Sequence, residues 1–170
     1  MRHTPQIASI EWLVKRPIAH RGLHDLNQDV LENTKTAFAR AITGRFAIEC
    51  DLQISADGEA VVFHDETVDR LMDAQGHVSE LTVSELKSLN FKASKARIQT
   101  LAELLDQVSG QVPVIAEIKS HWDGNPQLPL RVVKTTSSYR DQLALMSFDS
   151  RIVALLAHQA PNRVRGIVAG

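Results

Sequence analysis

The sequence predicts an α/β fold built on parallel β-strands, and two patterns lead to that prediction. Short apolar runs of strand character alternate along the chain with segments whose apolar residues recur at helical spacing. Several of these runs end in polar or charged residues, as do strands that deliver side chains to the carboxyl end of a parallel sheet or barrel. We count five such strand units, at residues 17–22, 46–54, 112–119, 143–148 and 164–169.

Composition narrows the class of protein. The chain has 170 residues, of which 44% are hydrophobic and 23% charged, and this is ordinary for one soluble globular domain. The net charge of −1 gives no basic surface for nucleic acid. The N-terminus lacks the apolar core of a secretory signal, and no apolar run is long enough to span a bilayer. We therefore expect a cytoplasmic protein without a transmembrane segment.

The first predicted strand ends in His20 and Arg21. A lone histidine at such a place is more often a surface or core residue than a catalytic one, but the guanidinium of Arg21 beside it suits phosphate oxygens. Glu32 and Asn33 come just before an amphipathic helix expected at residues 35–43. Two interpretations of this pair stay open, because it would serve either to cap the helix or to support a site around His20.

Residues 47–65 carry most of the candidate chemistry. They form two extended runs, and the Asp57-Gly58 pair between them is typical of a two-residue type I′ hairpin turn. With these two residues as the loop, Asp51 lies directly opposite His64 on one face of the hairpin.

Glu49 shares that face with Asp51, and the same register places Glu66 opposite Glu49. Acids gathered on one strand face are costly unless they are solvated or bound to a cation. The face is therefore either an ordinary solvated one or a divalent-metal site with His64 as an acid–base group. Cys50, the only cysteine, points to the opposite face and is expected to be a buried core thiol.

Residues 66–97 are polar and irregular, and they are too numerous for a tight connection between a strand and a helix. We interpret them as a small insertion over the site. Within it, Thr82 and Glu85 have the spacing of a capping box that begins a short helix. His77 has no polar constellation around it and is expected at the surface.

The strand unit at residues 112–119 ends with Glu117 and Lys119 on one face. These are either solvated charges at a strand end or side chains that point into the mouth of the sheet, where ligands bind. Helices are expected at residues 101–108, 130–138 and 152–158, and residues 10–14 fit either a short helix or the approach to a strand.

Six motifs occur in one order with natural spacing: IAHRG (18–22), ENT (32–34), IECDLQISADGEAVVFHD (48–65), IQTLAELL (98–105), IAEIK (115–119) and MSFD (146–149). Together they closely resemble the glycerophosphodiester phosphodiesterase family, over residues 17–170. The resemblance implies a single domain over residues 1–170 that forms a partial (β/α)₈ TIM barrel. About five of its eight units are present, with the small insertion after the second strand at residues 66–97.

The resemblance also implies an activity, the hydrolysis of glycerophosphodiesters to sn-glycerol 3-phosphate and an alcohol with a divalent cation. By motif position, Glu49, Asp51 and Glu117 would bind the metal, and His20 and His64 would be the general acid and base. Arg21 and Lys119 would hold the phosphate, with Glu32 and Asn33 supporting the site. Three carboxylates suit Mg²⁺ or Ca²⁺ better than zinc.

A complete barrel of this kind takes about 250 residues, whereas five strand units are counted here. We therefore expect either a fragment whose C-terminal half is missing or a barrel that another chain completes, such as a second copy. Two other functions stay open beside the small-molecule phosphodiesterase. One is an inactive, incomplete barrel that serves as a binding or assembly partner, and the other is an enzyme of the same fold that acts on lysophospholipids.

Overall fold

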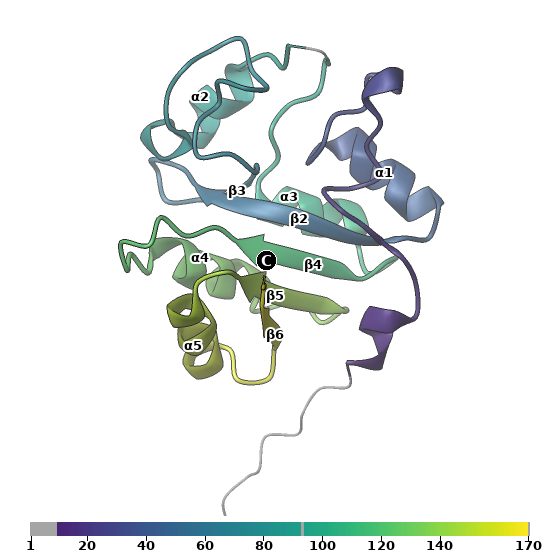
Figure 1. Ribbon diagram of the computed structural model, residues 1–170, viewed down its shortest axis with the longest axis vertical. Helices are drawn as coiled ribbons and strands as arrows, with labels where there is room; N and C mark the ends of the chain where they lie inside the picture. The colour runs from purple at the N-terminus through teal and green to yellow at the C-terminus, as the bar shows by residue number, and fades with distance from the viewer. Residues whose placement is uncertain (1–9, 93, 170) are drawn as a thin grey trace, which may run out of the picture.

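The computed structural model describes residues 10–92 and 94–169, and its centre is one β-sheet (Figure 1). Neighbouring strands in this sheet follow the order β1-β2-β4-β5-β6. The sixth strand, β3, lies outside this order and pairs with β2. The five strands of that order run parallel: β1 (Ile18–Ala19), β2 (Ala47–Ile54), β4 (Val114–Ile118), β5 (Leu143–Ser147) and β6 (Val164–Ile167). Because each strand lies beside the next one in the chain, the sheet winds in one direction, as the wall of a (β/α)₈ barrel does.

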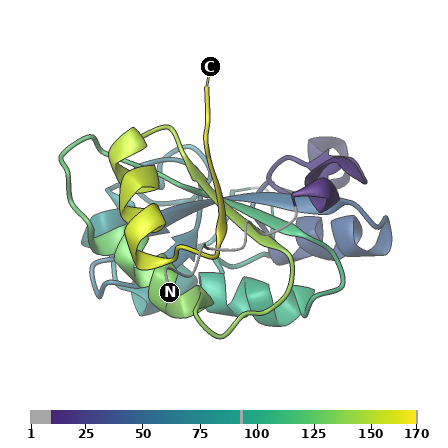
Figure 2. The same cartoon turned by 90° about the horizontal axis from the view of Figure 1, so that it is seen from below.

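Four helices cover one face of this sheet (Figure 2). They are α1 (Lys35–Thr43), α3 (Leu101–Val108), α4 (Gln127–Thr136) and α5 (Ser150–Gln159). Side chains from all four join one hydrophobic core with alternate residues of the strands, among them Ile48, Cys50, Val114 and Leu145. Cys50 is thus the buried core thiol that strand alternation predicts.

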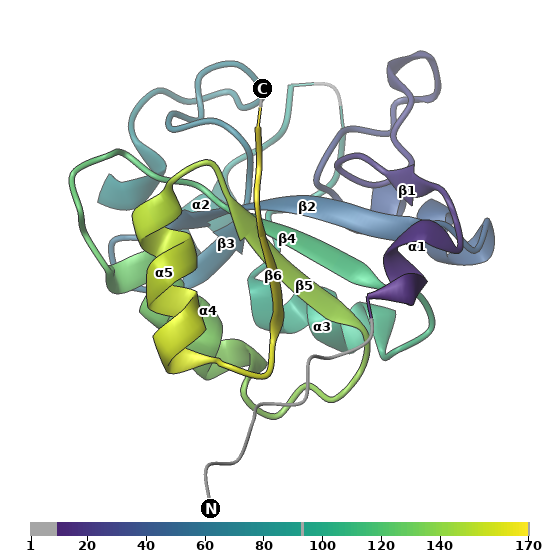
Figure 3. The ribbon, with the colours of Figure 1, turned by 60° about the horizontal axis from the view of Figure 1, so that its bottom comes forward.

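The opposite face of the sheet has a smaller apolar cluster near the amino ends of its strands. Trp12, from the 3₁₀ helix η1 (Glu11–Val14), packs there against Ala47, Ile115 and Ala144. Figure 3 shows this face, with the purple η1 at its edge. The acids Glu49, Asp51 and Glu117 have the same strand parity as these residues, so they lie on this face and not in the main core.

The helices predicted at residues 35–43 and 101–108 are present with those bounds, and other predicted elements are present with shifted ends. The helix expected at residues 130–138 begins earlier, because Asn125 accepts a hydrogen bond from the Gln127 N–H through its Oδ1 atom. The helix expected at residues 152–158 begins at Ser150, with Asp149 as its N-cap. Residues 10–14 were predicted as either a short helix or the approach to a strand, and they contain a short helix, η1.

The hairpin turn is one residue longer than predicted. β3 (Ala60–Val62) pairs with β2 through Leu52–Val62, Gln53–Val61 and Ile54–Ala60. The Ser55 N–H donates to the Glu59 carbonyl, and Gly58 has a φ of +76°, so three residues form the loop. The Ser55 hydroxyl also bonds Asp57 and accepts from the Glu59 N–H, which stabilises this longer turn.

The predicted register is therefore wrong by one residue. Asp51 lies opposite Phe63, whose N–H donates to the Asp51 carbonyl at 3.0 Å, and not opposite His64. A one-residue shift moves side chains to the other face of a strand. The predicted pairing of Glu49 with Glu66 is wrong for the same reason, because Glu66 instead contacts His77 and the side chain of His121.

Residues 66–97 pack around a second hydrophobic cluster beside β3. This segment contains η3 (Val78–Glu80) and α2 (Val83–Ser88), and a third 3₁₀ helix, η2 (Leu26–Gln28), lies in the loop before α1. Thr82 and Glu85 form the predicted capping box at the start of α2. His77 is exposed, as expected, with 48% of its side chain accessible.

Candidate metal centre and active site

Three carboxylates from two neighbouring strands converge on the inner face of the sheet. Glu49 and Asp51 come from β2 and Glu117 from β4, and one carboxylate oxygen from each lies within 4.8 Å of the others. The parallel register pairs Asp51 directly with Glu117, and alternation along β2 adds Glu49. All three residues are buried, with exposed fractions of 5%, 1% and 7%. The structure thus brings together the acids that the sequence predicted as metal ligands.

These acids have too few partners for their degree of burial. Lys119 Nζ lies 2.7 Å from Asp51 Oδ1 and 2.6 Å from Glu117 Oε1, so one ammonium serves two carboxylates. Glu49 Oε1 is buried and has no hydrogen-bond partner among the described residues. A buried, unpaired carboxylate oxygen beside two further carboxylates fits a hard divalent cation, which prefers oxygen ligands.

Burial, together with the negative charge of nearby Asp51, raises the pKa of Glu49 to about 7. The Arg21 N–H donates to Glu49 Oε2 at 2.8 Å and opposes this rise. A raised carboxyl pKa means that the folded chain binds a proton more tightly than the unfolded chain does. Between the two pKa values, stability must then fall as the pH rises.

We therefore expect the metal-free chain to lose stability between about pH 4.5 and pH 7 through Glu49. A rise in its pKa from 4.5 to about 7 corresponds to about 3 kcal/mol of unfolding free energy. Urea unfolding of the wild type and Glu49→Gln across this range isolates the effect, because the other titrating groups are common to both. If the difference in unfolding free energy between the wild type and Glu49→Gln does not change with pH, the raised pKa of Glu49 is contradicted.

Arg21 and Gly22 form a tight turn directly after β1. Both have positive φ, +56° and +79°, and a Cβ atom at Gly22 would lie 2.9 Å from Ala37 Cβ. This turn directs the Arg21 guanidinium toward the acids: Nε lies 3.4 Å from Asp51 Oδ2, and Nη1 donates to Glu32 Oε1 at 2.9 Å. Arg21 Nε is buried and makes no hydrogen bond within the described residues, which leaves one donor for a ligand.

Asn33 holds Asp51 from the other side. Its Nδ2 donates to Asp51 Oδ2 at 2.8 Å, and its Oδ1 accepts from the Asp51 N–H at 3.3 Å. The cap of α1 is Thr34, whose hydroxyl accepts from the Ala37 N–H. Asn33 therefore contacts the acid cluster, and Glu32 contacts Arg21.

The two histidines differ in their surroundings. His20 has 69% of its side chain exposed, and its Nε2 lies 3.9 Å from Glu49 Oε2. His64 follows β3, and its backbone carbonyl accepts from Gln53 Nε2 at 3.0 Å. Gln53 is two residues beyond Asp51 on the same face of β2, so it holds the His64 backbone beside the row of acids. The His64 Nδ1 atom lies 2.7 Å from Asp65 Oδ1.

Three residues of this region are absent from the predicted site, namely Gln53, Asp65 and Arg70, whose guanidinium donates to both Asp65 and Glu32. Strand alternation already places Gln53 on the face of Asp51, so a signal for it was present in the sequence. Asp65 is adjacent to His64, and carboxylates that orient an imidazole are common in active sites. Nothing in the sequence pattern marks Arg70, because its contacts depend on how residues 66–97 fold.

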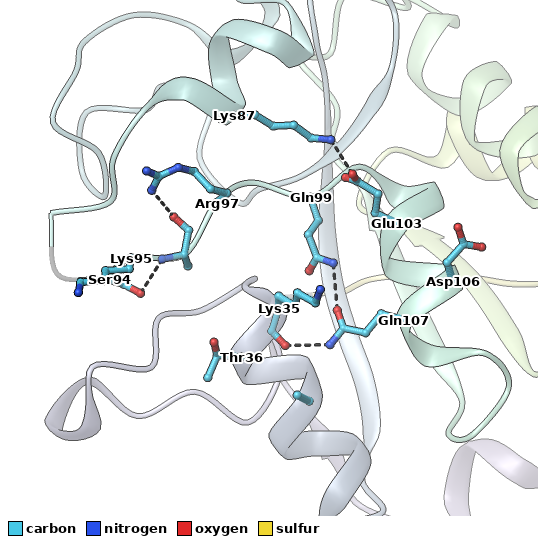
Figure 4. A pocket seen from close by; sticks show the side chains of 12 residues that line it. Lys35, Thr36, Lys87, Ser94, Lys95, Arg97, Gln99, Glu103, Asp106 and Gln107 are labelled. Atoms are coloured by element: carbon cyan, nitrogen blue, oxygen red, sulfur yellow. Dashed lines mark hydrogen bonds and ion pairs between the residues drawn. The ribbon is translucent and has the colours of Figure 1, made fainter.

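A large hollow lies elsewhere on the molecule (Figure 4). It measures about 1150 Å³ and is formed by α1, α3 and residues 94–99. Gln99 donates to Gln107, which in turn donates to the Lys35 carbonyl. None of the predicted site residues lines this hollow, so size alone does not locate the candidate site.

The parallel sheet and the acid cluster on its inner face define a (β/α)-barrel protein with a candidate metal centre at the carboxyl ends of the strands. Residues 20–169 match the glycerophosphoryl diester phosphodiesterase family, and the chain belongs to that family. The resemblance and the fold class predicted from the sequence are thereby confirmed.

Individual proteins that are similar to this chain in sequence or in fold agree with its assignment to the family. The chain is 33% identical over 161 residues to a glycerophosphodiester phosphodiesterase from Caldanaerobacter subterraneus subsp. tengcongensis, covering 89% of this chain and 65% of that protein. Its fold is similar to that of an Oleispira antarctica phosphodiesterase solved with the product sn-glycerol-3-phosphate, with a TM-score of 0.81, 24% identity and coverage of 91% and 66%. It is also similar to a glycerophosphodiester phosphodiesterase from Agrobacterium tumefaciens, with a TM-score of 0.74, 28% identity and coverage of 88% and 65%.

The chain thus spans about two thirds of the length of these relatives. Among the described residues, no helix combines the length and the apolar character that crossing a bilayer requires.

Proposed function

We propose that this protein hydrolyses glycerophosphodiesters to sn-glycerol 3-phosphate and an alcohol with the help of a divalent cation. The observation that carries the proposal is the convergence of Glu49, Asp51 and Glu117 beside the guanidinium of Arg21. A buried carboxylate cluster next to a cationic side chain suits a site where a metal ion and an anionic phosphate meet.

In this proposal the three carboxylates hold Mg²⁺ or Ca²⁺, since both cations prefer oxygen ligands. When bound, the cation supplies positive charge that attracts the phosphodiester and stabilises charge on its oxygens during reaction. Arg21 contributes its guanidinium to the phosphate, including the Nε donor that has no hydrogen-bond partner among the described residues, and Lys119 contributes its ammonium. Glu32 and Asn33 keep Arg21 and Asp51 in place.

The histidines move the protons. Because the Asp65 carboxylate only accepts hydrogen bonds, His64 donates to it from Nδ1, and the neutral form of the ring then carries its lone pair at Nε2. We assign His64 as the base that takes a proton from the nucleophile. The nucleophile is a water molecule, which gives sn-glycerol 3-phosphate directly, or the neighbouring glycerol hydroxyl, which gives a cyclic phosphate that water opens to the same product. His20 then acts as the acid that protonates the leaving alkoxide oxygen.

The experiment that tests this function measures glycerol 3-phosphate released from glycerophosphocholine. We expect release with Mg²⁺ or Ca²⁺ present, loss of release after treatment with a chelator, and recovery when the cation is restored. Lysophosphatidylcholine serves as the competing substrate, because preferential cleavage of it would indicate a lysophospholipid-active enzyme. Cleavage of lysophosphatidylcholine at the same bond gives lysophosphatidic acid and choline, so choline is the product common to both substrates. Absence of choline release from both substrates with cation present would contradict a phosphodiesterase.

A second candidate function is assembly without catalysis, and exposed apolar side chains at one edge of the sheet favour it. Phe148, which follows β5, is 46% exposed, and Ile167, the last residue of the edge strand β6, is 55% exposed. Unpaired strand edges readily pair with another chain. Sedimentation that gives a dimer, together with no turnover, would favour this candidate over the enzyme.

A further inference from the structure

Arg70 joins two carboxylates that are 33 positions apart in the sequence, Glu32 and Asp65. Its Nε lies 2.5 Å from Asp65 Oδ2, and its Nη2 lies 3.0 Å from Asp65 Oδ1. The same Nη2 donates to Glu32 Oε1 at 2.6 Å, while Nη1 donates to Glu32 Oε2 at 3.3 Å. Arg70 therefore makes a two-point contact with each carboxylate, which is the most specific geometry a guanidinium offers.

Each of these carboxylates also holds one residue of the proposed active site. Asp65 Oδ1 lies 2.7 Å from His64 Nδ1, and Glu32 Oε1 accepts from Arg21 Nη1 at 2.9 Å. One continuous chain of contacts thus runs from the imidazole of His64 to the guanidinium of Arg21, with Arg70 at its middle.

The charges along this chain alternate in sign. Burial alone would raise the pKa values of Glu32 and Asp65, but hydrogen bonds and charge from Arg70 outweigh it and lower both. The hydrogen bonds that Arg70 donates to Asp65 and Glu32 raise the pKa of Arg70 in turn. Without Arg70, two ionised carboxylates would face a common space and repel one another.

The backbone that carries Arg70 is anchored. Val68 and Met72 on either side of it are fully buried in the second hydrophobic cluster. The Met72 N–H donates to the Val68 carbonyl at 2.9 Å, and the Lys92 N–H donates to the Leu71 carbonyl at 2.9 Å. The Arg70 side chain itself is 47% exposed, and ion pairs of such exposure contribute little to stability. Its contacts are therefore better explained by orientation than by stability.

We propose that Arg70 is a positioning residue, which fixes His64 and Arg21 relative to one another through Asp65 and Glu32. The inference rests on the proposed function, in which His64 exchanges a proton and Arg21 holds the phosphate. It also gives residues 66–97, which we propose to be an insertion in a single domain over residues 1–170, a direct role in the site.

The first test is spectroscopic and does not depend on activity. At about pH 8, where an ordinary histidine is neutral, we expect side-chain ¹⁵N NMR of the wild type to show His64 protonated at Nδ1 and not at Nε2. In Arg70→Gln the Asp65 carboxylate loses its clamp, so the His64 signals should move toward the mixture of tautomers that we expect for Asp65→Asn. Arg97→Gln is the matched control, because Arg97 belongs to the same segment, is exposed and, within the described part of the chain, bonds only the Ala96 carbonyl.

Arg70→Lys covers the case in which Arg70→Gln does not fold. A single ammonium cannot make two-point contacts with both carboxylates, so we expect an intermediate shift of the His64 signals. If Arg70→Gln folds and its His64 signals match those of the wild type, the proposal is overturned. If Arg70→Gln does not fold, wild-type His64 signals in Arg70→Lys overturn it.

The second test uses the turnover assay. We expect Arg70→Gln to lower kcat about 10-fold or more, as loss of an orienting partner commonly does, while Arg97→Gln leaves kcat unchanged. In the Asp65→Asn background the same substitution should lower kcat much less, because Arg70 acts through Asp65. Fully additive losses would overturn the proposal. Absence of wild-type turnover would contradict the phosphodiesterase function alone, since the NMR result decides the role of Arg70 separately.

Discussion

Replacing Asp51 by Asn is expected to lower the turnover of glycerophosphocholine by about 10²- to 10³-fold. Asp51 lies at the centre of the site: it pairs with Lys119 at 2.7 Å, lies 3.4 Å from Arg21 and accepts from Asn33 at 2.8 Å. Asn keeps the shape and one oxygen acceptor but removes the charge. A cation that depends on three carboxylates then loses one of them, and with it several kcal/mol of charge stabilisation.

Asp106→Asn is the matched control, because Asp106 is an exposed residue of α3 outside the acid cluster. It should retain wild-type kcat and KM when both variants are assayed at saturating Mg²⁺ or Ca²⁺. Wild-type turnover in Asp51→Asn would mean that the acid cluster is not the metal centre of the reaction.

Replacing His64 by Ala is expected to lower kcat by about 10²-fold or more, with KM for the substrate little changed. The imidazole is assigned to proton transfer and not to binding, and its Nδ1 is held by Asp65 at 2.7 Å. His20→Ala should show a loss of similar size, because the second proton transfer is then unassisted.

His158→Ala provides the comparison, since His158 is exposed on α5 and takes no part in the proposed site. The pH–rate profile adds a readout beyond rate alone. The profile of His64→Ala should lack the limb that requires an unprotonated base. Retention of the full bell shape in this variant would remove His64 from the mechanism.

Much of the fold could be predicted because its elements have strong local signals. The alternation in β2 predicted both the buried Cys50 and the inward acids, and the capping box at Thr82 and Glu85 marked the start of α2. The convergence of Glu117 with Asp51 depends on β2 and β4 being neighbours, and the resemblance to a known family provided that information before the structure did.

The hairpin register and the Arg70 contacts could not be predicted in the same way. Asp57-Gly58 is typical of a two-residue turn, but the Ser55 side chain stabilises a three-residue loop, and the two choices differ by hydrogen bonds too weak to judge from the sequence. Arg70 meets Glu32 only after residues 66–97 have packed their own core, and no local pattern encodes that packing.

Calorimetric titration of the chain with Mg²⁺ and with Ca²⁺ most directly tests the central claim, that Glu49, Asp51 and Glu117 together bind one divalent cation. We expect one cation site per chain in the wild type, near-complete loss of binding in both Asp51→Asn and Glu117→Gln, and unchanged binding in Asp106→Asn. Wild-type affinity in either of the first two variants, or no cation binding by the folded wild type, would contradict it.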